Sequence, residues 1–141
     1  MLRIEPLHRW HLERLLAQGV RECCLALDTE GMIASLEPHG YAGVVDKNVA
    51  ATVGVVEEHP GNWHCWAYTD PILASLYFLP IARAMKRWLD GFKVPRIQTV
   101  VMVGNERGDR WVKLLGFEKE CVMRNWTDSQ DVTLYSRINR G

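Results

Sequence analysis

The sequence predicts an α/β (α+β) fold, because strand patterns and helix patterns alternate along its 141 residues. The stretch Ile97–Val103 is rich in β-branched residues and nearly free of charge, which is typical of a strand covered on both faces. A helical pattern follows, in which Trp111, Leu114 and Leu115 recur on one side. A chain of this length favours one domain, residues 1–141, with a single core.

The first part of the chain is predicted to form one strand and two helical regions. Leu2–Pro6 is a short strand that its proline ends. Leu7–Gln18 is a helix closed by Gly19, and a second helical region covers Arg21–Leu36. The apolar face predicted for the first helix consists of Leu7, Trp10, Leu12, Leu15 and Leu16.

From residue 41 onward, the apolar residues recur with a period of two, which indicates strands. Tyr41–Val45 and Val49–Glu57 are predicted to form an antiparallel hairpin, and Trp63–Thr69 is the next strand. Near the C-terminus, Glu120–Trp126 and Val132–Ile138 are predicted to form a second hairpin.

Composition excludes several classes of function. Acidic and basic residues balance at 17 each, so no net field attracts nucleic acid or an anionic membrane surface. No apolar run approaches the roughly 20 residues of a membrane span, and the N-terminus lacks the apolar region of a signal peptide. We therefore expect a protein made in the cytoplasm, with neither nucleic acid nor a membrane as its partner.

Cysteine and tryptophan usage adds two further expectations. The four cysteines form no CxxC pair and have no metal-finger spacing, so we expect reduced thiols and no metal site. Six tryptophans are many for this length, and large aromatic residues dominate both cores and interfaces. The surplus is compatible with a surface that contacts another protein.

Two motifs stand at a characteristic separation in the second half of the chain. Asn105 follows the strand Ile97–Val103, and the next helix closes in Leu115-Gly116-Phe117. A glycine suits this C′ position, where a left-handed conformation costs a residue without Cβ least. The order of strand, asparagine, helix and Leu-Gly-Phe resembles the GNAT (Gcn5-related N-acyltransferase) superfamily. An ordinary β-α-β unit with a glycine C-cap would give the same local pattern.

The GNAT resemblance implies a single domain with a mixed central sheet of about six to seven strands and helices on both faces. It also implies an acyl-CoA cleft beside the strand Trp63–Thr69, whose exposed edge pairs with cofactor amides in working enzymes. In the family, an Arg/Gln-x-x-Gly-x-Gly/Ala loop opens the helix after this strand. Free backbone N–H groups and the helix dipole bind the pyrophosphate there.

This chain departs from the family at that loop, since no glycine lies between Gly61 and Gly91. One register aligns residues 80–82 with the glycine element and predicts a helix over Pro80–Asp90. Its first residue then supplies no N–H group and holds φ near −65°. The residues left for a phosphate, and hence the predicted cofactor contacts, are Ile81, Ala82 and Arg83.

A second register starts the helix at Asp70, whose carboxylate would cap the helix and repel an anion. The family would also assign Asn105 to the cofactor's pantetheine arm. As a structural residue, Asn105 is a good helix N-cap or strand-end turn former, and this alone would account for it. Both roles of Asn105 stay open.

Catalysis would also need an acid for the leaving thiolate and a base for the acceptor amine. The helix position that holds a tyrosine in many family members holds Val112 here, and valine cannot donate a proton. Tyr135 or Cys121 would have to replace it. A lone strand histidine, with an ordinary pKa near 6.5, is more often structural than catalytic. The candidate bases are His64, Glu57 and Glu58.

Two functions therefore remain open. The first is a pseudoenzyme, a GNAT-fold protein with a degraded acyl-CoA site, no cofactor, and protein partners that are virion proteins or copies of itself. Small GNAT-like proteins of short-tailed bacteriophages, including the T7-type internal virion protein, share the Val103-Gly104-Asn105 context and an aromatic strand like Trp63–Thr69. That resemblance implies a virion or assembly component made in the host cytoplasm. The second function is a divergent acetyl-CoA-dependent N-acyltransferase.

Overall fold

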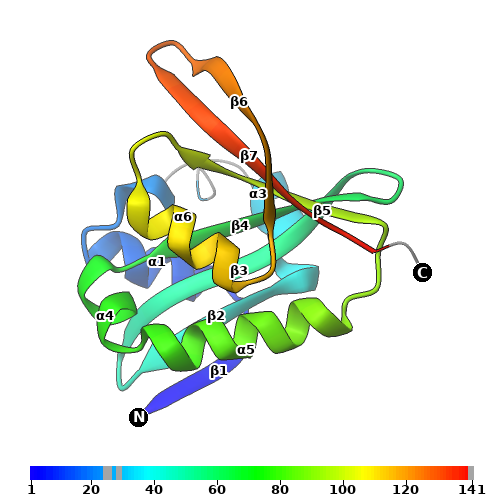
Figure 1. Cartoon of the computed structure of the whole chain (residues 1–141). Coiled ribbons are helices and arrows are strands. Elements are labelled where there is room, and N and C mark those ends of the chain that lie inside the picture. Colours follow the sequence, from blue (N-terminus) through cyan, green and yellow to red (C-terminus); the bar gives the residue numbers. More distant parts are fainter. Residues whose placement is uncertain (24–26, 28–29, 140–141) are drawn as a thin grey trace. The chain divides into compact units, whose positions relative to one another are not determined.

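The computed structural model describes residues 1–23, 27 and 30–139. It contains a seven-stranded mixed sheet in the order β1-β2-β3-β4-β5-β7-β6, together with helices (Figure 1). The predicted α/β (α+β) fold class with a mixed sheet of six to seven strands is confirmed. The residues form two compact units, which are described separately: an N-terminal unit, Met1–Val56 with Cys65–Ile81, and a C-terminal unit, Glu57–His64 with Ala82–Gly141.

The N-terminal unit contains one edge of the sheet. Its strands are β1 (Leu2–Pro6), β2 (Gly40–Val45), most of β3 (Asn48–His59) and the second half of β4 (Asn62–Thr69). The first three strands pair antiparallel, in a register that places Leu2 opposite Val45. The predicted first strand and first hairpin are therefore confirmed. The turn of this hairpin uses Asp46 with a positive φ of 55°.

The helices of this unit are α1 (Arg9–Ala17), the 3-10 turns η1 (Arg21–Cys23) and η2 (Glu37–His39), α3 (Glu30–Leu36) and α4 (Pro71–Leu76). The first predicted helix is confirmed and closes at Gly19, which has a φ of 103°. The helical region predicted over Arg21–Leu36 is confirmed at its two ends. Its residues 24–26 and 28–29 lie outside the described part of the chain.

Helices cover both faces of the sheet in the N-terminal unit. Alternate residues of a strand point to opposite faces. Ala42 and Val44 of β2 belong to a buried core that includes Leu12 of α1 and Ile33 of α3. On the other face, a Cβ placed on Gly43 would lie 3.9 Å from Cγ1 of residue 81, in the first turns of α5 (Phe78–Gly91). The predicted covering of both faces is thus confirmed here.

The buried face of α1 differs from the predicted face at one position. Trp10 is 44% exposed, whereas His11 is fully buried beside Leu12 and Leu15. The prediction that Trp10 belongs to the apolar face is wrong. A histidine can occupy the buried position because both of its ring nitrogens have hydrogen-bond partners.

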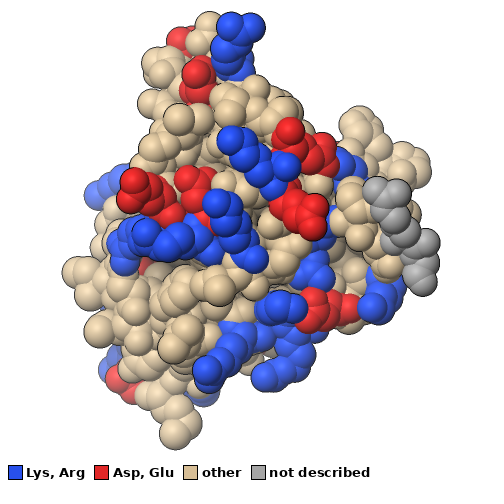
Figure 2. Space-filling view, in the orientation of Figure 1, with Lys and Arg blue, Asp and Glu red and all other residues tan. Residues whose placement is uncertain are grey.

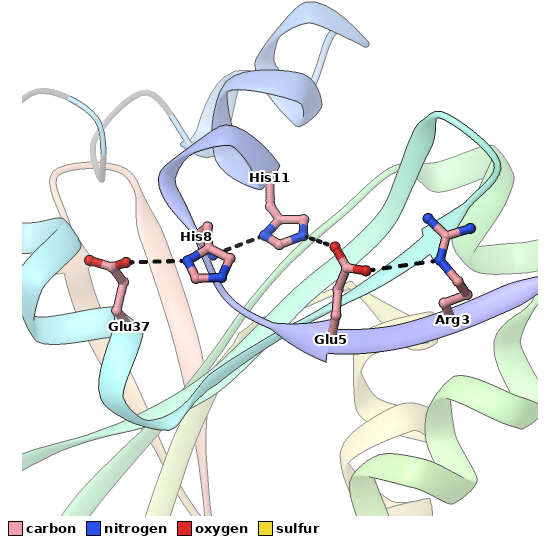
Figure 3. A network of polar contacts seen from close by, with 5 residues as sticks. All are labelled: Arg3, Glu5, His8, His11 and Glu37. Carbon is pink, nitrogen blue, oxygen red and sulfur yellow. Dashed lines mark hydrogen bonds and ion pairs between the residues drawn. The ribbon is translucent and has the colours of Figure 1, made fainter.

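Figure 3 shows the polar network around His11, which joins β1 to the start of α1. Its Nδ1 accepts the backbone N–H of His8 over 2.9 Å, so Nδ1 carries no proton. Nε2 lies 2.8 Å from Glu5 Oε1 and is therefore the nitrogen that donates, an assignment that follows from the hydrogen-bond arrangement. Longer contacts of 3.9 Å join Arg3 to Glu5 and His8 to Glu37. The His11 ring thus completes the capping box of α1.

Replacing His11 by leucine should lower the free energy of unfolding by about 2–3 kcal/mol, because the Glu5 carboxylate and the His8 N–H would lose their partner. Glu5→Gln is the matched control. It keeps an oxygen that accepts from Nε2, so its cost should be about 1 kcal/mol or less. Urea unfolding followed by circular dichroism measures both losses. If both variants lost the same free energy of unfolding, the hydrogen bonds of the His11 ring would not account for the stability of this site.

The C-terminal unit contains the other edge of the sheet. Its elements are the start of β4, most of α5, β5 (Arg96–Met102), α6 (Glu106–Leu114), β6 (Glu118–Thr127) and β7 (Gln130–Ile138). β5 pairs parallel with β4, where Trp63 lies opposite Ile97, and antiparallel with β7. β6 and β7 form the long hairpin drawn in orange and red in Figure 1. The three predicted strands of this region are confirmed, with ends shifted by one or two residues.

The end of α6 confirms the predicted role of Gly116. Its φ is 91°, and Leu115 is the C-cap residue before it. The N–H of Gly116 bonds to the carbonyl of Lys113, and the N–H of Phe117 bonds to that of Val112, both over 3.0 Å. These two bonds define a Schellman motif, which satisfies helix carbonyls that would otherwise lack a donor.

Candidate functional site

The junction between β5 and α6 carries Asn105, the asparagine of the predicted motif. It is exposed and caps α6: its Oδ1 accepts the backbone N–H of Gly108 over 3.0 Å. A Cβ on Gly108 would lie 2.8 Å from Asn105 Nδ2 and 2.8 Å from Cγ1 of Val101, so only glycine fits under the cap. The predicted structural role of Asn105 is confirmed, and its contact with a pantetheine arm stays a prediction.

Gly108→Ala should lower the free energy of unfolding by about 1–3 kcal/mol, since the added methyl group would overlap the cap and Val101. The matched control is Gly91→Ala at the end of α5, where an added Cβ meets nothing within 4 Å. This control should be neutral or stabilise by up to about 1 kcal/mol. Urea unfolding measures both. The same loss in the two variants would contradict the packing at Asn105.

Tyr135, the candidate acid, lies on β7 and is 2% exposed. Its hydroxyl donates to Oδ1 of Asp109 on α6 over 2.8 Å. Burial first, and then the Asp109 carboxylate, raise the pKa of Tyr135 to about 12. A phenol with this pKa holds its proton at neutral pH, so Tyr135 stabilises the contact between α6 and β7 and is a weak acid for a leaving thiolate.

The candidate bases lie on β3 and β4, on either side of the turn that joins these strands. His64 Nδ1 is 3.8 Å from Glu58 Oε1. Burial lowers the pKa of His64, and the Glu58 carboxylate opposes this shift. His64 is therefore neutral at pH 7 and can accept a proton. Glu57, in contrast, uses its Oε2 to accept the backbone N–H of Gly61 over 3.1 Å, which closes the turn.

The structure does not bring His64 and Tyr135 together. His64 lies opposite Gln98, and Gln98 lies opposite Ser136, so these three side chains share one face of the sheet. Tyr135 precedes Ser136 on β7, so its side chain points to the other face, where it meets α6. The predicted acid and the predicted base therefore cannot act from the same side of the sheet.

A polar network occupies the face that His64 shares. Arg96 donates to Gln98 Oε1 over 3.0 Å and to Glu120 Oε2 over 2.6 Å. The hydroxyl of Ser136 donates to the same oxygen of Glu120. Arg96, and then Ser136, lower the pKa of Glu120, so this carboxyl stays ionised. The network links β5, β6 and β7, and its groups are engaged with one another.

Sequence reasoning missed the residues that partner these candidates. Asp109 lies 26 positions from Tyr135, and Glu120 lies 16 positions from Ser136. No local spacing signals such pairs, because the fold alone brings the two strands and the helix into contact. Cys121, the alternative candidate for the acid, is exposed on β6 and lies opposite Leu134.

The pKa of His64 should lie below its ordinary value of 6.5. Between the folded-state pKa and 6.5, the unfolded chain binds a proton that the folded chain does not. The contribution of the neutral His64 ring to the stability of the folded state is therefore fully present above pH 6.5. This contribution is lost as the pH falls through the folded-state pKa. Glu58→Gln removes the carboxylate that raises this pKa, so the value should fall further. An NMR titration of the ring that gives a pKa above 6.5, or no change in Glu58→Gln, would contradict this.

The segment between β4 and α5 holds the short helix α4, and its cap is the one predicted. Asp70 Oδ1 accepts the N–H groups of Ile72 and Leu73 over 3.0 and 3.1 Å. Its other oxygen accepts Nε2 of Gln18 over 2.8 Å. The predicted capping by Asp70 is confirmed. The carboxylate occupies the N–H groups that an anion would use at this helix start.

The prediction that Ile81, Ala82 and Arg83 offer free backbone N–H groups is wrong. α5 begins at Phe78, two residues earlier than predicted, so these residues lie beyond its first three positions. The N–H of Ile81 donates to the carbonyl of Tyr77 over 3.1 Å, and residues farther along a helix bond in the same way. The side chains of Ile81 and Ala82 are buried, which leaves the exposed Arg83 side chain for a phosphate.

Basic side chains gather on α5 and α6 of the C-terminal unit (Figure 2). Asp90 of α5 bonds to Arg137 over 2.7 Å, and Asp109 of α6 bonds to Tyr135 two residues earlier on β7, so both helices cover one face. Arg137, and then Lys86, lower the pKa of Asp90 to about 2. The exposed basic residues on these two helices are Arg83, Lys86, Arg87, Arg107, Arg110 and Lys113.

Residues 1–23, 27 and 30–139 contain neither a candidate metal-ligand group nor a candidate membrane-spanning helix. No group of three or more His, Cys, Asp or Glu side chains in that part of the chain could hold a metal ion. None of its helices is long and apolar enough to cross a membrane. Cys23 and Cys65 are buried, and Cys24 lies outside the described residues.

Comparison with known proteins shows the fold. No protein-family model and no curated protein matches the chain. The solved ribosomal-protein-S18-alanine N-acetyltransferase from Escherichia coli is 15% identical with a TM-score of 0.72, over 100% of this chain and 96% of that chain. The ribosomal-protein-S5-alanine acetyltransferase from Vibrio fischeri is 14% identical with a TM-score of 0.73, over 99% and 93%.

A GNAT-family acetyltransferase from Bacillus cereus is 9% identical with a TM-score of 0.68, over 100% of this chain and 99% of that chain. Together these likenesses show that the chain has the fold of GNAT acetyltransferases. At such low identity they show the fold alone, and function has to be argued from the site.

Proposed function

We propose that this protein uses the GNAT fold as a scaffold for protein contacts and carries an acyl-CoA site too degraded for catalysis. The observation that carries the proposal is the start of α5. Pro80 has no N–H group, and the N–H of Ile81 already donates to the carbonyl of Tyr77. A diphosphate needs several free N–H groups at a helix start, and this one leaves few.

Two further features support the same function. In the second register, the start of the capped short helix α4 would correspond to the family's glycine loop, and the Asp70 carboxylate that caps it would repel a phosphate. Tyr135 donates to Asp109 and has a pKa of about 12, so the leaving thiolate would lack an effective acid. Acetyl-CoA therefore fits these residues poorly.

We further propose that the protein contacts belong to a virion or to its assembly in a short-tailed bacteriophage. The likeness of Val103-Gly104-Asn105 and of the aromatic strand Trp63–Thr69 to the T7-type internal virion protein supports this role. Its partners would be virion proteins or further copies of the chain. Neighbouring genes for portal, capsid or tail proteins would agree with it, and their absence would count against it.

A second candidate function is a divergent acetyl-CoA-dependent N-acyltransferase. The exposed basic residues of α5 and α6, Arg83 among them, favour it because they could contact the phosphates of coenzyme A. The neutral His64 beside Glu58 could serve as its base. The similar solved structures are named as acetyltransferases, two of them acting on alanine of a ribosomal protein.

Acetyl-CoA at about 1 mM should leave the melting temperature of the protein unchanged if the site is degraded. A ligand present at 100 times its Kd would add about 2.7 kcal/mol to the free energy of unfolding. For a domain of this size, that gain would raise the melting temperature by several degrees. Differential scanning fluorimetry of the full chain, with and without acetyl-CoA, measures the shift.

Two variants decide what a positive shift would mean. A rise in melting temperature that Arg83→Glu or Asn105→Ala abolishes would overturn the proposal in favour of the acyltransferase. Lys47→Glu is the matched control for charge, since Lys47 is exposed in the turn between β2 and β3 of the N-terminal unit. A shift without turnover of any amine would indicate a sensor that binds acyl-CoA.

A further inference from the structure

The exposed sides of α5 and α6 in the C-terminal unit carry an excess of positive charge (Figure 2). Six basic side chains are exposed there, against two exposed acidic side chains, Asp90 and Glu106. Asp90 is already paired, with Arg137 over 2.7 Å and with Lys86 over 2.9 Å. We call the six basic residues the basic face: Arg83, Lys86, Arg87, Arg107, Arg110 and Lys113.

A single guanidinium group holds the two helices together at their C-terminal ends. One terminal nitrogen of Arg137 donates to the carbonyl of Leu115, the C-cap residue of α6. The other terminal nitrogen donates to Asp90 in the last turn of α5. The two halves of the basic face are therefore neighbours on one side of the sheet, on helices that are already fixed. A surface that is ordered before binding loses little conformational entropy when it meets a partner.

Several cations of the basic face lack a counter-charge within the chain. Arg87, Arg110 and Lys113 have no hydrogen-bond or ion-pair partner among the described residues. A helix dipole favours cations in a last turn, and of these three only Lys113 has that position. Asp109 does not neutralise them, because its carboxylate accepts from Tyr135. The uncompensated charge is available for the acidic groups of a partner.

A cavity of about 260 Å³ lies beside the end of α5 within the C-terminal unit. Its walls include two cations, Lys93 and Arg137, and one carboxylate, Asp90. Because Arg137 is paired with Asp90, Lys93 is the cation of this cavity that has no partner among the described residues. Small-molecule sites measure roughly 300–1,000 Å³, so this cavity suits one side chain better than a whole ligand. A carboxylate side chain would meet the Lys93 ammonium there.

The basic face suits an acidic protein segment better than nucleic acid. A nucleic acid duplex carries about one charge per 1.7 Å, and the exposed carboxylates of Asp90 and Glu106 would repel so dense a row. Bases of a single strand stack on aromatic rings, whereas Trp88 and Trp111 are half-buried. An aliphatic side chain, Leu114 of α6, is 54% exposed next to the cations. A polypeptide can cover it with an apolar side chain of its own.

We propose that the basic face binds an acidic segment of a partner protein, one of whose carboxylate side chains enters the cavity beside Lys93. This inference rests on the proposed function, because it names the chemistry of the protein contact. Guanidinium groups meet carboxylates in bidentate pairs, and three of the four unpaired cations of the basic face are arginines. Exposed ion pairs are weak one by one, so the affinity comes from several pairs together and falls as salt is added.

A fluorescein-labelled peptide of ten glutamates tests this contact by fluorescence anisotropy with the full chain. We expect a Kd in the micromolar range at about 50 mM salt, rising at least about fivefold at about 300 mM. The double variant Arg87→Glu/Lys113→Glu should raise the Kd at least about tenfold, because two attractive pairs become repulsive. Lys93→Gln should raise it about two- to fivefold, since the cavity loses its unpaired cation.

The matched control is Arg21→Glu/Lys47→Glu, which changes the net charge equally at two exposed residues of the N-terminal unit. It should change the Kd less than about threefold, because it removes no pair with the peptide. Circular dichroism verifies that each variant is folded. If Arg87→Glu/Lys113→Glu is not, the neutral pair Arg87→Gln/Lys113→Gln replaces it, with Arg21→Gln/Lys47→Gln as control.

Four results would overturn the proposal: no binding of the peptide, equal weakening in the two double variants, an unchanged Kd in Lys93→Gln, or tighter binding of a ten-nucleotide oligothymidylate. Displacement of the peptide by about 1 mM glutarate would also overturn it, because the cavity would then take a free small acid. The peptide is measured without acetyl-CoA. Its failure to bind would therefore leave the acetyl-CoA melting result, and with it the degraded site, unaffected.

Discussion

A buried or helical backbone N–H group needs an acceptor, and this constraint organises the segment between β4 and α5. In GNAT acyltransferases, glycines at this place leave several N–H groups free, and the diphosphate of the cofactor is their acceptor. Here the Asp70 carboxylate takes two of them, the carbonyl of Tyr77 takes a third from Ile81, and Pro71 and Pro80 bring none. Each of these hydrogen bonds and prolines is favourable at a helix start. Each also removes a donor that a phosphate would use.

The same need for hydrogen-bond partners explains two polar side chains elsewhere that resemble catalytic residues. His11 is buried with a carboxylate beside it, which is a common arrangement for a general base. Its Nδ1, however, accepts the N–H of His8, so the lone pair that a base would use is engaged in capping α1. Tyr135 is engaged in the same way by Asp109. Both polar groups are thus engaged in hydrogen bonds that stabilise the fold, and the geometry supports a structural role for each.

Local signals predicted most of the fold. The strands follow from a period of two, and Gly116 follows from the demand for a left-handed residue after α6. The predicted start of α5 at Pro80 is wrong because a proline fits every position of a first turn, where its missing N–H is not needed. Pro71 holds the first position of α4, whereas Pro80 holds the third position of α5. The position that a proline takes within the first turn is set by neighbouring residues, and the sequence pattern does not identify them.

The candidate site was less predictable than the fold, because its contacts join distant elements. Asn105 could be assigned as a cap from its place between a strand and a helix, and the structure agrees. The partners of His64 and Tyr135 depend on which face of the sheet each strand residue occupies. A shift of one residue in the register of β7 would have exchanged those faces. Chemistry at this site is therefore decided by register, which only the folded chain reveals.

Under the proposed function, the chain would lack the stabilisation that cofactor binding provides, and the surface after β4 would serve another purpose. Ile72, Leu76 and Leu79 are exposed in the segment that follows β4. Exposed leucine and isoleucine there would be of no use to a diphosphate, which requires donors and positive charge. They are of use to a protein surface, which gains from apolar burial without charge. The function that we propose rests on this difference in surface chemistry within a single segment.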